Sequence, residues 1–423
     1  MSNSSGTIGP VRAWSLAAGG MVGGGIYIAL GVIIDAAGEW AWLSFVIAGI
    51  AAVLTAFSYA ALTVKFGASG GAFDFLEEVN RKSWAGSLSW LLILGYVLTI
   101  SVYGFAFGNY VAYAFGGGEW LIRVLIAVIV AAIITLNLAG AGKLTSVEVV
   151  IVSGNLLILL ALAAVGLWSW APEQLAAGIE TKPVSAALFG AAVTFVSYEG
   201  FQLLTYDYDT MDRPEHWFTP MLVSAAVFVV FVYVAVTLGA TMISGAGAIV
   251  ANPGVALSIA ARRALGPAGL IAMTFAAAFA TSAAINSTLF STAKLIGRVA
   301  RDGELPTWLG HHNSNDIPDR AVIGIGILAA ALAMLGSLLS LVEAASLVFL
   351  FTFFTVNLIA AVKLDGNRWA SWVGTVLSAI IGVALIARLF DRQPWGLACV
   401  LVLVAAIFLL RPLLFDRSRS QVE

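Results

Sequence analysis

Residues 11–34 read VRAWSLAAGGMVGGGIYIALGVII, an apolar run that is interrupted at its centre by five glycines within residues 19–25. About 20 apolar residues cross a bilayer core of about 30 Å as a helix, so this run is long enough to span a membrane. Each glycine costs roughly 1 kcal/mol of helix propensity relative to alanine. The stretch therefore predicts a membrane helix whose middle tends to leave the helical conformation.

The rest of the chain is equally apolar. Hydrophobic residues make up 61% of the 423 residues and charged residues only 10%, whereas soluble domains carry roughly 25% charged residues. We therefore expect an all-α integral membrane protein that forms one polytopic domain over residues 1–423. A scan for apolar runs predicts twelve spans, at 11–34, 41–64, 84–115, 119–139, 146–170, 184–207, 219–243, 266–297, 320–342, 344–364, 369–390 and 394–414.

The basic residues predict an orientation. If the N-terminus is cytoplasmic and each span crosses once, 15 of the 21 Lys and Arg residues face the cytoplasm, as the positive-inside rule requires. Spans 9 and 10 nearly merge at Glu343, and a count of eleven stays open; it would move the C-terminal arginines outward and weaken this bias. We expect both termini inside the cell and a location in the plasma membrane.

Composition excludes several classes. The net charge of −2 leaves no basic surface for nucleic acid. The single Cys399 and the three scattered histidines assemble no metal site, so we expect no cofactor and no certain metal. An enzyme lacks a visible catalytic set, and a channel would need a selectivity ring that the sequence does not show.

A second interruption lies in the sixth span, where residues 195–201 read FVSYEGF. An acid within an apolar run marks a functional site by default, and Gly200 after Glu199 supplies a flexible point. The alternative is that Glu199 is only solvated by a vestibule. For the first span the alternative is close helix packing, because its glycines also match small-xxx-small spacing.

The two interrupted spans are five apart. If spans 1–5 and 6–10 form two halves, the odd number of helices inverts the second half. A break in the same helix of both halves points to a substrate site at the membrane midplane. This pairing favours the ligand interpretation over packing.

At these residues the chain resembles the amino acid–polyamine–organocation transporter superfamily. Residues 19–27 (GGMVGGGIY) look like its first-helix signature, and 68–73 (ASGGAF) like the segment after its second helix. The run 198–214 matches its sixth-helix pattern, and 294–306 the end of its eighth helix, with Lys294 in place of arginine. Together the four motifs are specific.

The resemblance implies a LeuT-type fold: two inverted five-helix repeats at about 11–170 and 184–364, discontinuous helices 1 and 6, and two additional helices at 369–414. It implies secondary transport of an amino acid or related amine by alternating access. Amides for the substrate carboxylate map to Gly23, Gly24 and Gly25. Carbonyls for its ammonium map to Met21, Val196, Ser197 and Glu199, while Tyr198 gates or packs the site beside Gly200.

One position departs from the family pattern. Proton-coupled relatives often carry a lysine in the fifth helix, where this chain has Asn155, and asparagine cannot carry a proton. Asn155 with Thr281 and Ser282 is therefore a candidate Na⁺ site, or a neutral hydrogen-bond network. Na⁺, H⁺ and exchange all stay open, as do an uncoupled facilitator, a transporter-like nutrient sensor and the oligomeric state.

Overall fold

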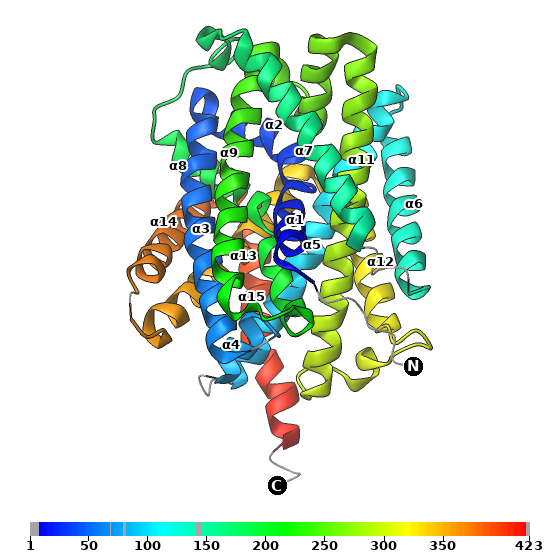
Figure 1. Cartoon of the computed structure of the whole chain (residues 1–423), viewed down its shortest axis with the longest axis vertical. Helices are drawn as coiled ribbons and strands as arrows, with labels where there is room; N and C mark the ends of the chain where they lie inside the picture. Colours follow the sequence, from blue (N-terminus) through cyan, green and yellow to red (C-terminus); the bar gives the residue numbers. More distant parts are fainter. Residues whose placement is uncertain (1–7, 68, 79–81, 141–144, 367, 420–423) are drawn as a thin grey trace.

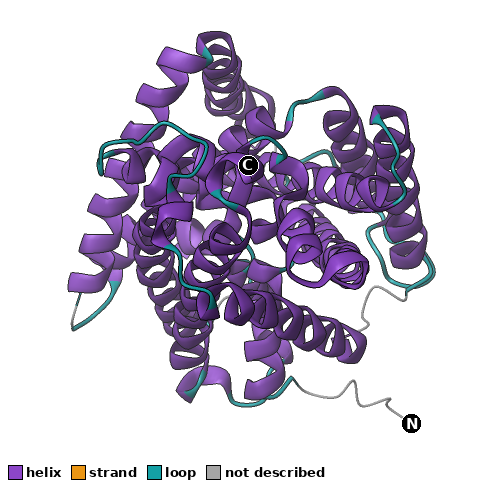
Figure 2. Cartoon of the chain, turned by 90° about the horizontal axis from the view of Figure 1, so that it is seen from above, coloured by secondary structure: helices purple, strands orange, loops and turns teal. Residues whose placement is uncertain are grey.

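Helices account for every regular element in the described part of the chain, and one bridge joins Ile8 to Met211. The computed structural model describes residues 8–67, 69–78, 82–140, 145–366 and 368–419. Figure 2 shows the helices packed side by side around a common centre, with the loops gathered at their ends.

Up to residue 168 the helices are α1 (Pro10–Val22), α2 (Gly25–Ala37), η1 (Gly38–Trp40), α3 (Ala41–Phe66), α4 (Ala72–Glu78), α5 (Lys82–Ala114), α6 (Glu119–Leu138) and α7 (Thr145–Trp168). The following helices up to residue 255 are η3 (Pro172–Leu175), α8 (Ala186–Val193), η4 (Thr194–Tyr198), η5 (Phe201–Thr210), η6 (Pro214–His216), α9 (Phe218–Ser244), α10 (Ala246–Val250) and η7 (Pro253–Val255). The last are α11 (Ala256–Arg301), η8 (Thr307–Gly310), α12 (Asp319–Leu335), α13 (Leu338–Lys363), α14 (Trp369–Arg392) and α15 (Pro394–Arg419).

Nine stretches of the described chain are long and apolar enough to cross a membrane. One of them, Pro10–Phe66, contains both of the first two predicted spans. The predicted span at 320–342 corresponds to α12, which has 17 residues, and the last corresponds to the shorter apolar stretch Pro394–Leu409. The helices are those of a multi-pass membrane protein, while the count of twelve spans stays a prediction.

The ends of these helices follow local chemistry. Gly67 ends α3 with a φ of 60°, a left-handed conformation that glycine adopts without steric cost. The hydroxyl of Ser337 accepts a hydrogen bond from the Ser340 N–H and caps α13. Within α11, Gly266 has a φ of 63° just before Pro267 and divides the helix by a kink.

The boundary expected at Glu343 is wrong. Gly336 and Ser337 separate α12 from α13, and Glu343 lies inside α13. Its carboxylate Oε1 accepts a hydrogen bond of 2.9 Å from Nε of Arg388 on α14, and both side chains are buried. A buried ion pair satisfies an acid within a helix, so this acid does not end the span.

The first two helices occupy the middle of the bundle. Figure 1 shows α1 and α2 surrounded by α5, α7 and α9, with α6 and α14 at opposite sides. Twelve of the thirteen residues of α2 are buried, whereas α14 exposes large apolar side chains such as Val376 and Val383. An apolar outer surface suits contact with lipid, and the interrupted helices lie away from it.

Candidate functional site

Two interruptions of the helical backbone meet in the centre of the bundle. Gly24, between α1 and α2, has φ −139° and ψ −24°. Glu199 is extended after η4, and Gly200 follows with a φ of 130°, which a residue with a Cβ atom rarely adopts. The backbone therefore departs from helical geometry at Gly24 and at Gly200, while the discontinuity of membrane helices 1 and 6 stays a prediction.

The two segments cross with their backbones in contact. A Cβ atom on Gly200 would lie 2.5 Å from the carbonyl carbon of Gly20, and one on Gly20 would lie 3.2 Å from the Gly200 oxygen. A Cβ atom on Gly25 would likewise lie 2.6 Å from the Ser197 carbonyl oxygen. The glycines of the first span thus permit close packing, as the alternative interpretation required, and this packing brings the two interruptions together.

Carbonyl groups from both interruptions converge on one hydroxyl. The Tyr233 hydroxyl of α9 lies 2.6 Å from the Met21 oxygen and 2.7 Å from the Ser197 oxygen. The Val196 carbonyl instead accepts a hydrogen bond from the Glu199 backbone N–H at 3.0 Å. Two of the carbonyls expected to receive an ammonium therefore share a hydrogen-bond donor, which is supplied by the protein.

Sequence reasoning missed Tyr233. The residue lies within the long apolar run of α9 and is fully buried. A buried tyrosine hydroxyl needs a hydrogen-bond partner, which was a usable signal, but the partner lies 212 residues away in the chain at Met21. Only the fold reveals this contact.

The Glu199 side chain is buried and surrounded by neutral groups. Its exposed fraction is 1%. Tyr103 of α5 donates its hydroxyl to Oε2 at 3.2 Å, and the Gln202 amide donates to Oε1 at 2.9 Å. Gln202 is itself held by the Gly200 N–H at 3.0 Å. In the described part of the chain, no Lys, Arg or His forms an ion pair with Glu199.

Tyr103 also covers the first interruption. A Cβ atom on Gly24 would lie 2.0 Å from Cδ1 of the Tyr103 ring. The same tyrosine therefore contacts Gly24 with its ring and Glu199 with its hydroxyl. The Tyr198 side chain, in contrast, is directed toward α3. Its hydroxyl donates to the Phe45 carbonyl at 2.7 Å, and its ring packs against Phe45 and Tyr233.

The residues expected to hold a coupling ion make separate contacts. Asn155 Oδ1 accepts a hydrogen bond from the Tyr27 hydroxyl. The hydroxyls of Thr281 and Ser282 donate to carbonyls of their own helix, at 2.6 Å to Ala277 and 2.6 Å to Ala278. A hydrogen-bond network between the three side chains is not observed within the described ranges, and the Na⁺ site stays a prediction.

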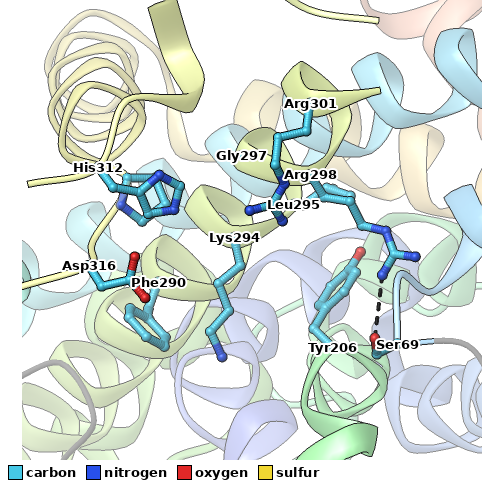
Figure 3. Close-up of a pocket in the computed structure, with 11 residues that line it drawn as sticks. Ser69, Tyr206, Phe290, Lys294, Leu295, Gly297, Arg298, Arg301, His312 and Asp316 are labelled. Atoms are coloured by element: carbon cyan, nitrogen blue, oxygen red, sulfur yellow. Dashed lines mark hydrogen bonds between the residues drawn. The ribbon is translucent and has the colours of Figure 1, made fainter. Parts of the chain in front are cut away.

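A polar pocket lies where η5 faces the end of α11. Its cavity of about 280 Å³ is lined by residues that include Ser69, Tyr206, Lys294, Arg298, Arg301 and His312, and we call it the Lys294 pocket (Figure 3). Lys294 pairs with Asp207 of η5 at 2.6 Å, and Arg298 pairs with Asp74 of α4 at 2.8 Å. Two ion pairs thus tie α11 to η5 and α4.

Burial changes the pKa of Asp74, the acid that pairs with Arg298. It raises the pKa of the Asp74 carboxyl from its ordinary value of 3.8 to about 6, although Arg298 and the Gly70 N–H favour the charged form. No group of three or more His, Cys, Asp or Glu side chains in the described residues is arranged to hold a metal ion.

This arrangement defines a class: a multi-pass helical membrane protein with buried polar groups where two segments depart from helical geometry. The model of a family described as amino acid permease matches residues 8–414. The chain belongs to this family.

Three relatives illustrate its range. The inner membrane transport protein YbaT of Escherichia coli is 27% identical over 93% of this chain and 94% of its own. A vacuolar cationic amino acid transporter 4 of Arabidopsis thaliana is 26% identical over 81% of this chain and 60% of its own. The serine/threonine exchanger SteT of Bacillus subtilis is 26% identical over 62% of this chain and 60% of its own.

Proposed function

We propose that this protein is a secondary transporter that moves amino acids across the plasma membrane by alternating access. The proposed architecture is the LeuT-type fold of twelve spans, with inverted repeats at about 11–170 and 184–364 and both termini in the cytoplasm. The family membership and the meeting of two interrupted helices support this architecture.

The convergence of the Met21 and Ser197 carbonyls on one donor carries the proposal. Each carbonyl comes from a different interrupted helix, and the space between them accommodates a single hydrogen-bond donor. The α-ammonium of an amino acid offers such donors, so binding would replace the Tyr233 hydroxyl at this point. The backbone amides of Gly24 and Gly25 would receive the carboxylate once the Tyr103 ring moves off Gly24, and that of Gly23 would first have to leave the Gly19 carbonyl, to which it donates at 2.8 Å.

Glu199 gives the proposal a substrate preference. A carboxylate without a cationic partner in the described chain favours a ligand that brings its own positive charge. The name of the Arabidopsis relative refers to cationic amino acids. We expect Glu199→Gln to weaken uptake of lysine and arginine far more than uptake of neutral amino acids, and an equal loss for both would remove charge recognition.

The ion pairs of the Lys294 pocket would close the path to the cytoplasm. Both pairs link α11 to other elements, at Asp207 of η5 and Asp74 of α4. Because a pair with solvent-accessible groups contributes little, the part-exposed Lys294–Asp207 contact can break and re-form as the helix bundle rocks, and the Arg298–Asp74 contact would open with it. Substrate would leave through this pocket when they open.

Uptake into proteoliposomes tests the proposal. The purified chain is reconstituted and presented with a panel of cationic, neutral and acidic amino acids, with Na⁺ and H⁺ gradients imposed separately. Saturable uptake that is absent from protein-free liposomes is expected. Binding without flux would favour a nutrient sensor, and flux that requires amino acid on the opposite side would favour exchange, the activity in the name of the Bacillus relative.

A further inference from the structure

Three glutamates with almost no exposed surface differ in what neutralises them. Glu343 pairs with Arg388, and Glu304 pairs with Arg411. Glu199 is equally buried, at 1% exposed, but its two oxygens face a tyrosine hydroxyl and a glutamine amide. An isolated carboxylate in a membrane protein interior is costly unless a positive charge or a proton neutralises it.

Tyrosine hydroxyls from four elements lie near Glu199. Glu199 acts electrostatically on five tyrosines of α3, α5, η5 and α9: Tyr59, Tyr96, Tyr103, Tyr206 and Tyr233. A basic side chain is not among these neighbours in the described residues. When the site holds no cation, the group that can neutralise Glu199 is therefore a proton.

Two hydrogen-bonded hydroxyls lie near this region, and one of them reaches the Lys294 pocket. The Tyr96 hydroxyl lies 3.2 Å from the Tyr206 hydroxyl, and Tyr206 lines the Lys294 pocket (Figure 3). Tyr96 and Tyr206 both lie within electrostatic range of Glu199. Because hydroxyl groups donate and accept hydrogen bonds, this pair can relay a proton at the pocket end of a path to Glu199.

We infer that Glu199 is a shared site for one proton and one cationic substrate, which exclude each other. The inference rests on the proposed function and deepens it. The protonated carboxyl releases its proton when the ammonium or guanidinium side chain of a substrate arrives, and the ionised carboxylate then pairs with that cation. The site stays neutral in both states, because one positive charge enters for each proton that leaves. The protein is thereby a proton antiporter for cationic amino acids.

Proton release on binding tests the inference directly. Isothermal titration calorimetry of L-lysine, in two buffers that differ in ionisation enthalpy, gives the number of protons released at each pH between 5 and 8. We expect close to one proton per bound lysine at the acid end and none for L-leucine. The Glu199→Gln variant should release none, while an unfolding temperature close to that of the wild type shows that the variant is folded.

Glu343→Gln is the matched control, because it removes an equally buried acid that already has a cationic partner. Its proton release should equal that of the wild type. In liposomes, an acidic interior should drive lysine accumulation by the wild type several-fold above equilibrium, and the Glu199→Gln variant should show no such accumulation.

Two negative results have different meanings. Lysine transport with no proton release, or with release that persists in Glu199→Gln, overturns the shared site and leaves amino acid transport standing. Absence of any amino acid flux in wild-type liposomes overturns the proposed function, and the shared site falls with it.

Discussion

Glu343 and Glu199 are two acids in apolar helices with the same exposed fraction, 1%, and different surroundings. Glu343 lies inside α13 and meets the Arg388 guanidinium of α14, where burial is matched by an opposite charge. Glu199 lies beside the positive-φ Gly200 and meets Tyr103 and Gln202, which are neutral. The first acid joins two helices, whereas the second leaves its charge available to a ligand.

Their positions explain the difference. Regular helix on both sides fixes Glu343, so its partner is always present. Glu199 follows a 3₁₀ segment and precedes another, and it faces the crossing of the two interrupted helices. A charge that is permanently neutralised stabilises a fold, and one that is not can respond to substrate or proton.

Breaking the permanent pair should have the largest effect on stability. We expect Arg388→Leu to cost about 3–5 kcal/mol, because it leaves the Glu343 carboxylate buried and unpaired. Thermal unfolding in detergent measures this loss. The double variant Arg388→Leu with Glu343→Leu should recover most of it. A single variant that unfolds within a degree of the wild type would contradict a structural role for the pair.

A side chain at Gly24 tests the link between the two interruptions. Gly24→Ala places a Cβ atom about where the Tyr103 ring lies, and we expect overpacking of about 1–3 kcal/mol together with loss of substrate binding. The matched control is Gly154→Ala in α7, where a Cβ atom would meet no heavy atom within 4 Å. Unchanged uptake by Gly24→Ala would show that this glycine serves neither packing nor binding.

Asp74 combines features of the two glutamates, because it pairs with the Arg298 guanidinium and burial also disfavours its charged form. Its pKa is raised to about 6, so the folded protein holds a proton that the unfolded chain releases near pH 4. The resulting stability is complete below about pH 4 and is lost as the pH rises through about 6. Asp74→Asn should therefore flatten unfolding temperatures between pH 4.5 and 7 and stabilise the protein by up to about 2 kcal/mol at pH 7. A steeper pH dependence in the variant would be the contrary result.

The positions where the backbone leaves helical geometry carry local signals in the sequence. Glycines clustered near Gly24 and an acid before Gly200 stand out within apolar runs. Contacts between distant segments could not be predicted. An acid such as Glu343 looks like the end of a span until its partner 45 residues away is known.

The same limit applies to hydroxyl groups. Thr281 and a sodium ligand look alike in sequence, yet the Thr281 hydroxyl bonds within its own helix. Tyr233 was overlooked because its two carbonyl partners belong to other segments. When a side chain can form its hydrogen bonds either within its own helix or with a distant segment, its partner is therefore known only from the fold. The spacing of residues in the sequence does not identify it.

The variant with the smallest expected effect on stability, Glu199→Gln, tests the comparison of Glu199 with Glu343 most directly. Glu199→Gln should change the free energy of unfolding by less than about 1 kcal/mol, whereas Glu343→Gln should cost about 3 kcal/mol. The amide can still accept from Gln202, and the Tyr103 hydroxyl can turn to accept from the amide, because a tyrosine hydroxyl both donates and accepts. Arg388 has donors only, so an amide opposite it leaves a guanidinium charge buried without compensation. Unfolding temperatures of both variants, measured in one detergent at pH 7, make this test. A loss at Glu199→Gln as large as that at Glu343→Gln would mean that Glu199 is also held by a fixed charge, and its availability to a substrate or a proton would have to be given up.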